Sequence, residues 1–201
     1  HLLATALDGL QYSPRTAGVQ LGDIVTQLPR LPARAQPLPP RVWPWWNMTL
    51  EPQLAGKIIL GLQTDEPATA IVPYFDYLNA DQKQSAIRRL KQAEVVADEA
   101  VRGHILTWIG ERAQGVWLAA CEAAATLTLC DSECQQLEGY LTRKTARLRR
   151  ELLQLLLRQG DEMVLASTGR LLAAGRIAQR EAGLELLAQM VTDNRAVGVG
   201  R

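Results

Sequence analysis

The sequence predicts an all-α protein of stacked antiparallel helices, and two observations favour this class. The 201 residues are 47% hydrophobic but only 5% aromatic, and Ala and Leu are abundant, as in helices that pack closely. The leucine clusters LLQLLL, RLLAAG and LELLAQM recur toward the C-terminus at intervals of about 15 to 16 residues. Each of these helices alone would expose an apolar face, so neighbouring helices must stack to cover it.

The first 52 residues form an irregular segment with an extended arm rich in proline and tryptophan. Eight of the ten prolines lie here, and each fixes φ and removes a backbone donor, which disfavours helix. Three of the five tryptophans, Trp43, Trp45 and Trp46, stand within four residues. We expect these rings to anchor the arm between helices. The alternative is an aromatic platform for a peptide or a base, with Arg41 adding charge.

Residues 53–201 are expected to form a helical, repeat-like domain. The apolar stretch 54–62 could be a helix or a strand, and a short helix is favoured. A second helix should begin at Thr64 and end near Leu78. Asn79 and Gln82 have the spacing of a capping box, so a helix should begin there. Beyond it, apolar residues at helical intervals mark the buried stripe: Ile87, Leu90, Val101, Ile105 and Trp108.

The second half of this domain contains the core and the repeat. After an interruption at Gly115, the Ala-rich segment 116–130 is the predicted central core helix. A long helix should then run to about Gln159, capped by Ser132 with Gln135, and with Leu141, Leu148, Leu152 and Leu155 on one face. Gly160 should end it, and Gly175 should separate two further helices, 161–174 and 176–192.

The segment LASTGRLLAAGRIAQREAGLELLAQMVTDN (165–194) resembles a HEAT-type helix pair. The order of DEAVRGHILTWIGE (98–111), the Ala-rich helix and this pair is similar to the helical part of large bacterial proteins described as molybdate-metabolism-regulator-like. The resemblance implies a HEAT-like α-α superhelix or an irregular helical array of unknown activity. The implied period, a little above 30 residues, is shorter than the roughly 40 of HEAT repeats. We expect the natural protein to continue beyond this segment.

Composition also limits the compartment. Three cysteines, Cys121, Cys130 and Cys134, are an odd number in a chain too large to need disulfide staples, which predicts a reducing, cytoplasmic setting. A structural zinc site needs four ligands, so the cysteines are interpreted as small buried hydrophobes on or beside the core helix. No apolar run approaches the roughly 20 residues of a membrane helix.

Catalytic signals are weak. His104 lies beside Val101 and Trp108 in helical projection and is interpreted as partly buried, with a structural hydrogen bond; the alternative is a general base in a pocket. Phosphate loops, metalloprotease motifs and nucleophile elbows are missing from the sequence. The sequence therefore leans against an enzyme, and it predicts no catalytic, cofactor-binding or metal-binding residue and no cofactor.

The run RKTARLRR (143–150) is the best local case for an anionic partner, because the net charge of +1 provides no field over the whole chain. A row of cations along one helical face can contact phosphates. A solvated face opposite the leucines is the favoured interpretation. The five basic residues concerned are Arg143, Lys144, Arg147, Arg149 and Arg150.

Three functions follow in order of preference. The first is a non-catalytic helical scaffold that binds another protein, or another domain of the same chain, in a groove between helices. The second is nucleic-acid or polyanion binding through the basic run. The third is a fragment of an enzyme whose active site lies elsewhere.

Overall fold

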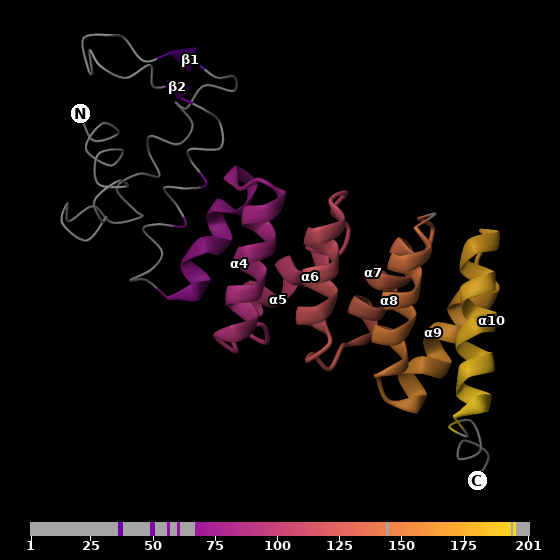
Figure 1. Ribbon diagram of the computed structural model, residues 1–201. Helices are drawn as coiled ribbons and strands as arrows, with labels where there is room; N and C mark the ends of the chain where they lie inside the picture. The colour runs from indigo at the N-terminus through magenta and orange to yellow at the C-terminus, as the bar shows by residue number, and fades with distance from the viewer. Residues whose placement is uncertain are drawn as a thin grey trace. The chain divides into compact units, whose positions relative to one another are not determined.

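The computed structural model describes residues 36–37, 49–50, 56, 60, 67–143, 145–193 and 195. The chain divides into two compact units, His1–Val95 and Val96–Arg201. Eight helices lie between Pro67 and Thr192, which confirms the predicted all-α class (Figure 1). The predicted domain boundary at residues 52 and 53 falls outside the described residues, and so does the predicted helix start at Thr64.

In the first unit, the structure describes a pair of short strands, each of two residues, and two helices. Strands β1 (Gln36–Pro37) and β2 (Thr49–Leu50) pair antiparallel, within the segment expected to be extended. Gly56 and Leu60 are helical, as predicted for 54–62, whose other residues are outside the described part. The next elements are the 3₁₀-helix η4 (Ala68–Tyr77) and α4 (Ala80–Gln92).

Helix η4 packs against α4 and differs in type from the α-helix expected there. Pro73 lies inside η4 and has no backbone N–H to donate, which disfavours a regular α-helical ladder. Phe75 is buried, and the Lys83 ammonium of α4 lies 5.0 Å from the centre of its ring. The capping box of α4 is confirmed, because Gln82 N donates to Asn79 Oδ1 at 2.9 Å and Asn79 N donates to Gln82 Oε1 at 3.0 Å.

Helix α4 ends in a backbone motif that its sequence does not indicate. Glu94 adopts a positive φ of 56°, and Val95 N donates to Leu90 O at 3.3 Å while Glu94 N donates to Lys91 O at 3.1 Å. This is the Schellman pattern, which usually uses glycine at the left-handed position. Helix α5 (Glu99–Trp108) then begins at Asp98, whose carboxylate accepts from Ala100 N at 2.9 Å.

The second unit is a two-layer stack of three helical hairpins (Figure 1). Helices α5, α7 (Asp131–Tyr140) and α9 (Asp161–Ala173) form one layer; α6 (Gln114–Ala124), α8 (Ala146–Leu157) and α10 (Ile177–Thr192) form the other. Each helix packs against its hairpin partner and against the next helix of its own layer. The starts of α6, α8 and α10 are about 31 residues apart, in agreement with the predicted period.

Helix α6 is the predicted core helix, and seven of its eleven residues are buried. Two details of the prediction were wrong. Gly115 lies inside α6 rather than before it, and the helix ends at Ala124 instead of Cys130. From Thr126 to Leu129, exposed threonines alternate with buried leucines, which is the two-residue period of extended chain. Leu129 N donates to the buried Gln159 Oε1 at 2.9 Å. A side chain of the next hairpin thus accepts the hydrogen bond of a backbone N–H in this segment.

The prediction of one long helix up to Gln159 was also wrong, because the chain turns between α7 and α8. Leu141 N donates to Glu138 O at 3.2 Å and the Thr142 hydroxyl donates to Gly139 O at 3.0 Å, which closes α7. All four leucines predicted on one face are buried, but Leu141 precedes α8. The N-cap of α7 is Cys130 rather than Ser132, and Cys130 N donates to Glu133 Oε2 at 2.7 Å. Helices α9 and α10 confirm the last two predicted helices.

Arginine–carboxylate pairs tie neighbouring hairpins together. The Arg102 guanidinium of α5 donates to Glu133 of α7 and to the carbonyl of Thr128. In the next pair, Arg170 of α9 contacts Glu138 of α7 at 2.7 Å, and the Glu138 side chain is only 8% exposed. Within the described part of the chain, no helix combines the length and the apolar character needed to cross a membrane.

The Arg102–Glu133 pair predicts a pH dependence of stability. The hydrogen bond from Arg102 lowers the pKa of the Glu133 carboxyl from 4.5 to about 2, so the folded state favours the ionised form of this carboxyl. The free energy of unfolding should therefore be highest above pH 5 and fall as the pH drops from about 5 to about 2. Glu133→Gln should remove about 1 kcal/mol at pH 7, because solvent screens this half-buried pair. Urea unfolding across this range should give a flatter pH profile for the variant; an unchanged slope would contradict the assignment.

Candidate functional site

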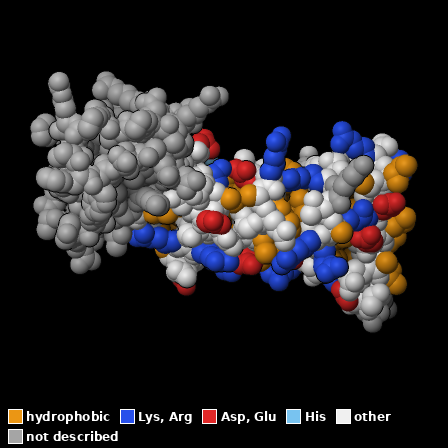
Figure 2. Space-filling view, turned by 45° about the horizontal axis from the view of Figure 1, so that its top comes forward, with side chains coloured by type: hydrophobic (Ala, Val, Ile, Leu, Met, Phe, Trp, Pro, Cys, Tyr) orange, Lys and Arg blue, Asp and Glu red, His pale blue; other side chains and the backbone are white. Residues whose placement is uncertain are grey.

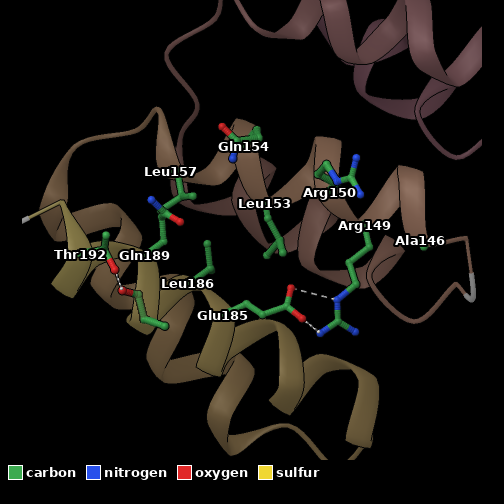
Figure 3. A pocket seen from close by; sticks show the side chains of 11 residues that line it. Ala146, Arg149, Arg150, Leu153, Gln154, Leu157, Glu185, Leu186, Gln189 and Thr192 are labelled. Carbon is green, nitrogen blue, oxygen red and sulfur yellow. Dashed lines mark hydrogen bonds and ion pairs between the residues drawn. The ribbon is translucent and has the colours of Figure 1, made fainter.

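A groove of about 510 Å³ lies between α8 and α10 (Figure 3). Leu153 of α8 and Leu186 of α10 form its buried floor, and the half-buried Leu157 extends it toward the end of α8. Exposed Gln154 and Gln189 stand on the two sides. The groove is therefore apolar at its base and lined by side-chain amides along its rim.

An ion pair closes one end of the groove. The Arg149 guanidinium lies 2.8 Å from a Glu185 carboxylate oxygen and 3.4 Å from Glu181, and it donates to Ala178 O at 3.3 Å. Figure 3 shows Arg149 and Glu185 reaching toward each other across the groove. Because α8 turns Leu148, Leu152 and Leu155 into the core, Leu153 and Arg149 lie on the side that meets α10.

The five basic residues predicted as a polyanion site do not form one row. Arg143 lies in the turn before α8 and donates to Gly110 O at 2.9 Å and to Glu111 O at 3.0 Å, so it joins two hairpin turns. Arg149 belongs to the ion pair at the groove. Arg147 and Arg150 are exposed on α8, and the side chain of Lys144 lies outside the described residues. Polyanion binding through this run stays a prediction.

Trp43, Trp45 and Trp46 lie outside the described residues, so their anchoring or binding role also stays a prediction. His104 was expected to be partly buried but is exposed. Its ring stacks on that of Trp108 with centroids 5.6 Å apart, and it lines neither the groove nor a second hollow of about 370 Å³ beside Gln159.

The cysteine prediction was right for two residues. Cys121 and Cys134 are buried, which raises the pKa of their thiols to about 12 and about 11, and Cys130 is exposed at the N-cap of α7. All three are free. Among the described residues, no cluster of three or more histidines, cysteines and carboxylates could hold a metal ion.

These environments predict unequal thiol reactivity. In the native protein at pH 8, Cys130 should react quickly with a thiol reagent, because it alone of the three is exposed. Cys121 and Cys134 should react only when the chain unfolds, because the thiolate is the reacting form and burial disfavours it. Time-resolved titration of thiols checks this, with Cys130→Ser as the control that removes the fast phase. Three equally fast thiols would show that the core is open.

The groove residues contributed by α10 were missed at the sequence level. Glu185 and Gln189 are ordinary polar positions of a helix, and the bond of Glu185 with Arg149 of α8 spans 36 residues. The signal that could have found them is the repeat period, since residues about 31 apart occupy neighbouring helices of one layer.

The fold and the groove define a class of protein: a stack of helical hairpins with a groove between successive helices of one layer. The particular family is shown by the sequence itself, because the family of unknown function DUF5724 matches residues 13–198, and the chain belongs to this family. Comparison with curated proteins and with solved structures gives no match.

Proposed function

We propose that this chain is a non-catalytic helical scaffold that binds a segment of another protein, or of another domain, in the groove between α8 and α10. The observation that carries the proposal is the combination of a leucine floor with an amide-lined rim. Leu153 and Leu186 can bury an apolar side chain, while Gln154 and Gln189 can satisfy backbone groups of a bound segment. Arg149 and Glu185 form an ion pair at one end, and the exposed Arg150 also lines the groove.

A HEAT-like architecture is part of this proposal. The two layers and the contact of each helix with the next in its layer support it, although the period of about 31 residues is shorter than in HEAT repeats. The likeness to molybdate-metabolism-regulator-like proteins adds no activity to the proposal. Three free thiols, two of them buried, support a reducing compartment such as the bacterial cytoplasm.

Filling the groove should abolish binding. Short peptides selected from a random library against the native chain serve as the probe, and fluorescence anisotropy measures their affinity. Ala188→Trp places an indole in the groove, so we expect the affinity of groove-binding peptides to fall by at least about tenfold. Because Ala188 is exposed in the apo protein, the variant should fold normally.

The matched control is Ala166→Trp, an equally exposed position that lines the separate hollow beside Gln159. This variant should bind the selected peptides as the natural chain does. Equal binding by Ala188→Trp and the natural chain would rule out the groove as the docking site.

Polyanion binding is the second candidate, and the exposure of Arg147 and Arg150 supports it. Heparin or duplex DNA should bind with an affinity that falls steeply as salt rises, and Arg147→Glu with Arg150→Glu should weaken it further, because phosphate or sulfate contacts release counterions. Arg143 and Arg149 are unsuitable for this test because they hold hairpins together. Binding that ignores both salt and the double substitution would eliminate this candidate.

A further inference from the structure

Helix α10 is apolar on two opposite sides. Its inner side, with Ala182, Leu186 and Met190, is buried against the stack. Its outer side exposes four large hydrophobic residues spaced three, four or seven apart, which places them on one face. They are Ile177 (66% exposed), Leu184 (57%), Leu187 (37%) and Val191 (61%). Figure 2 shows hydrophobic side chains gathered at the end of the stack where α10 lies.

The repeat register shows what this outer face corresponds to. When α6, α8 and α10 are aligned on their first residues, the eighth positions are Cys121, Leu153 and Leu184. Their exposed fractions are 2%, 9% and 57%. The eleventh positions, Ala124, Leu156 and Leu187, follow the same course at 0%, 1% and 37%.

The first two members of each series are covered because a later helix packs beside them. Helix α8 packs against α6, and α10 packs against α8. The outer face of α10 is thus the third member of an interface that the molecule forms twice already. Its side chains have the apolar character of the covered positions, not of a solvated helix face.

A polar position repeats in the same register. Arg149, the fourth residue of α8, reaches forward to Glu181 and Glu185 of the next helix in the layer. The fourth residue of α10 is Arg180, and its guanidinium donates to the carbonyls of Ala174 and Gly175 in its own hairpin turn, each at 3.1 Å. A helix stacked on α10 in the same mode would bring carboxylates within reach of Arg180.

We propose that the outer face of α10 is a stacking surface for a further helical hairpin of the same repeat, placed on α10 as the α9–α10 hairpin is placed on α8. The occupant carries a leucine- and alanine-rich inner face and acidic residues opposite Arg180. The occupant is identified as a hairpin because this surface continues the α6–α8 and α8–α10 interfaces. In both of these interfaces, the covering helix is the next helix of the same layer. The groove lies on the side of α10 toward α8, and its lining residue Ala188 adjoins this surface, four residues after Leu184.

The test adds the occupant. In an extended chain, a second copy of residues 158–193 follows Asp193, so that its helices can continue both layers. Stacking should raise the thermal midpoint by about 5 °C, because each added interface contributes to repeat stability. Leu184→Glu should remove this gain in the extended chain and have almost no effect in the natural chain, where Leu184 is exposed. Glu122→Gln, which also changes the charge by one unit at an exposed helical position, is the matched control and should have the same small effect in both chains.

Two outcomes would overturn the proposal. One is an extended chain with an unchanged midpoint, or one in which Leu184→Glu is as harmless as in the natural chain. The other comes from sedimentation of the natural chain: a dimer that Leu184→Glu dissociates would assign this face to a second copy instead of a hairpin. A monomeric natural chain together with a Leu184-dependent gain in the extended chain supports the stacking surface.

Discussion

The structure of the second unit depends on one constraint: a helix inside the stack must bury apolar side chains on two sides. Helix α6 meets it with alanine and cysteine, which allow close approach, and α8 meets it with leucines toward both neighbours. A helix with one apolar stripe would end the array, whereas a two-sided helix requires a neighbour beyond it. The two layers, the period and the course of burial along each layer all follow from this requirement.

Charged side chains fix the register of the hairpins that the apolar faces bring together. Arg102, Arg143 and Arg170 each reach a partner about one repeat away, and Arg143 does so through backbone carbonyls at a hairpin turn. Such bonds satisfy carbonyls that helix ends leave without partners. Arg143 and Arg149 both serve as ties between hairpins, which explains why the run 143–150 does not form a single cationic row.

The same stacking produces the surfaces to which function is assigned. Where α8 and α10 pack side by side, a groove remains with Leu153 and Leu186 at its floor. The outermost helix keeps the apolar character of an inner one. Both features arise from the spacing of leucines rather than from a dedicated motif.

The sequence by itself determined the all-α class, the cap at Asn79, the core position of α6 and the last two helices, because composition, capping spacing and helical periodicity are local. Only the tertiary structure decided where the chain turns after Glu94, Ala124 and Tyr140. The break after Glu94 is closed by local backbone bonds at a residue that is not glycine, whereas the segment after Ala124 donates from Leu129 N to Gln159 Oε1, and Arg143 in the turn after Tyr140 donates to Gly110 O. The last two bonds span about one repeat, so no local pattern indicates them. The groove was likewise beyond the sequence, because its two walls lie on helices about 31 residues apart.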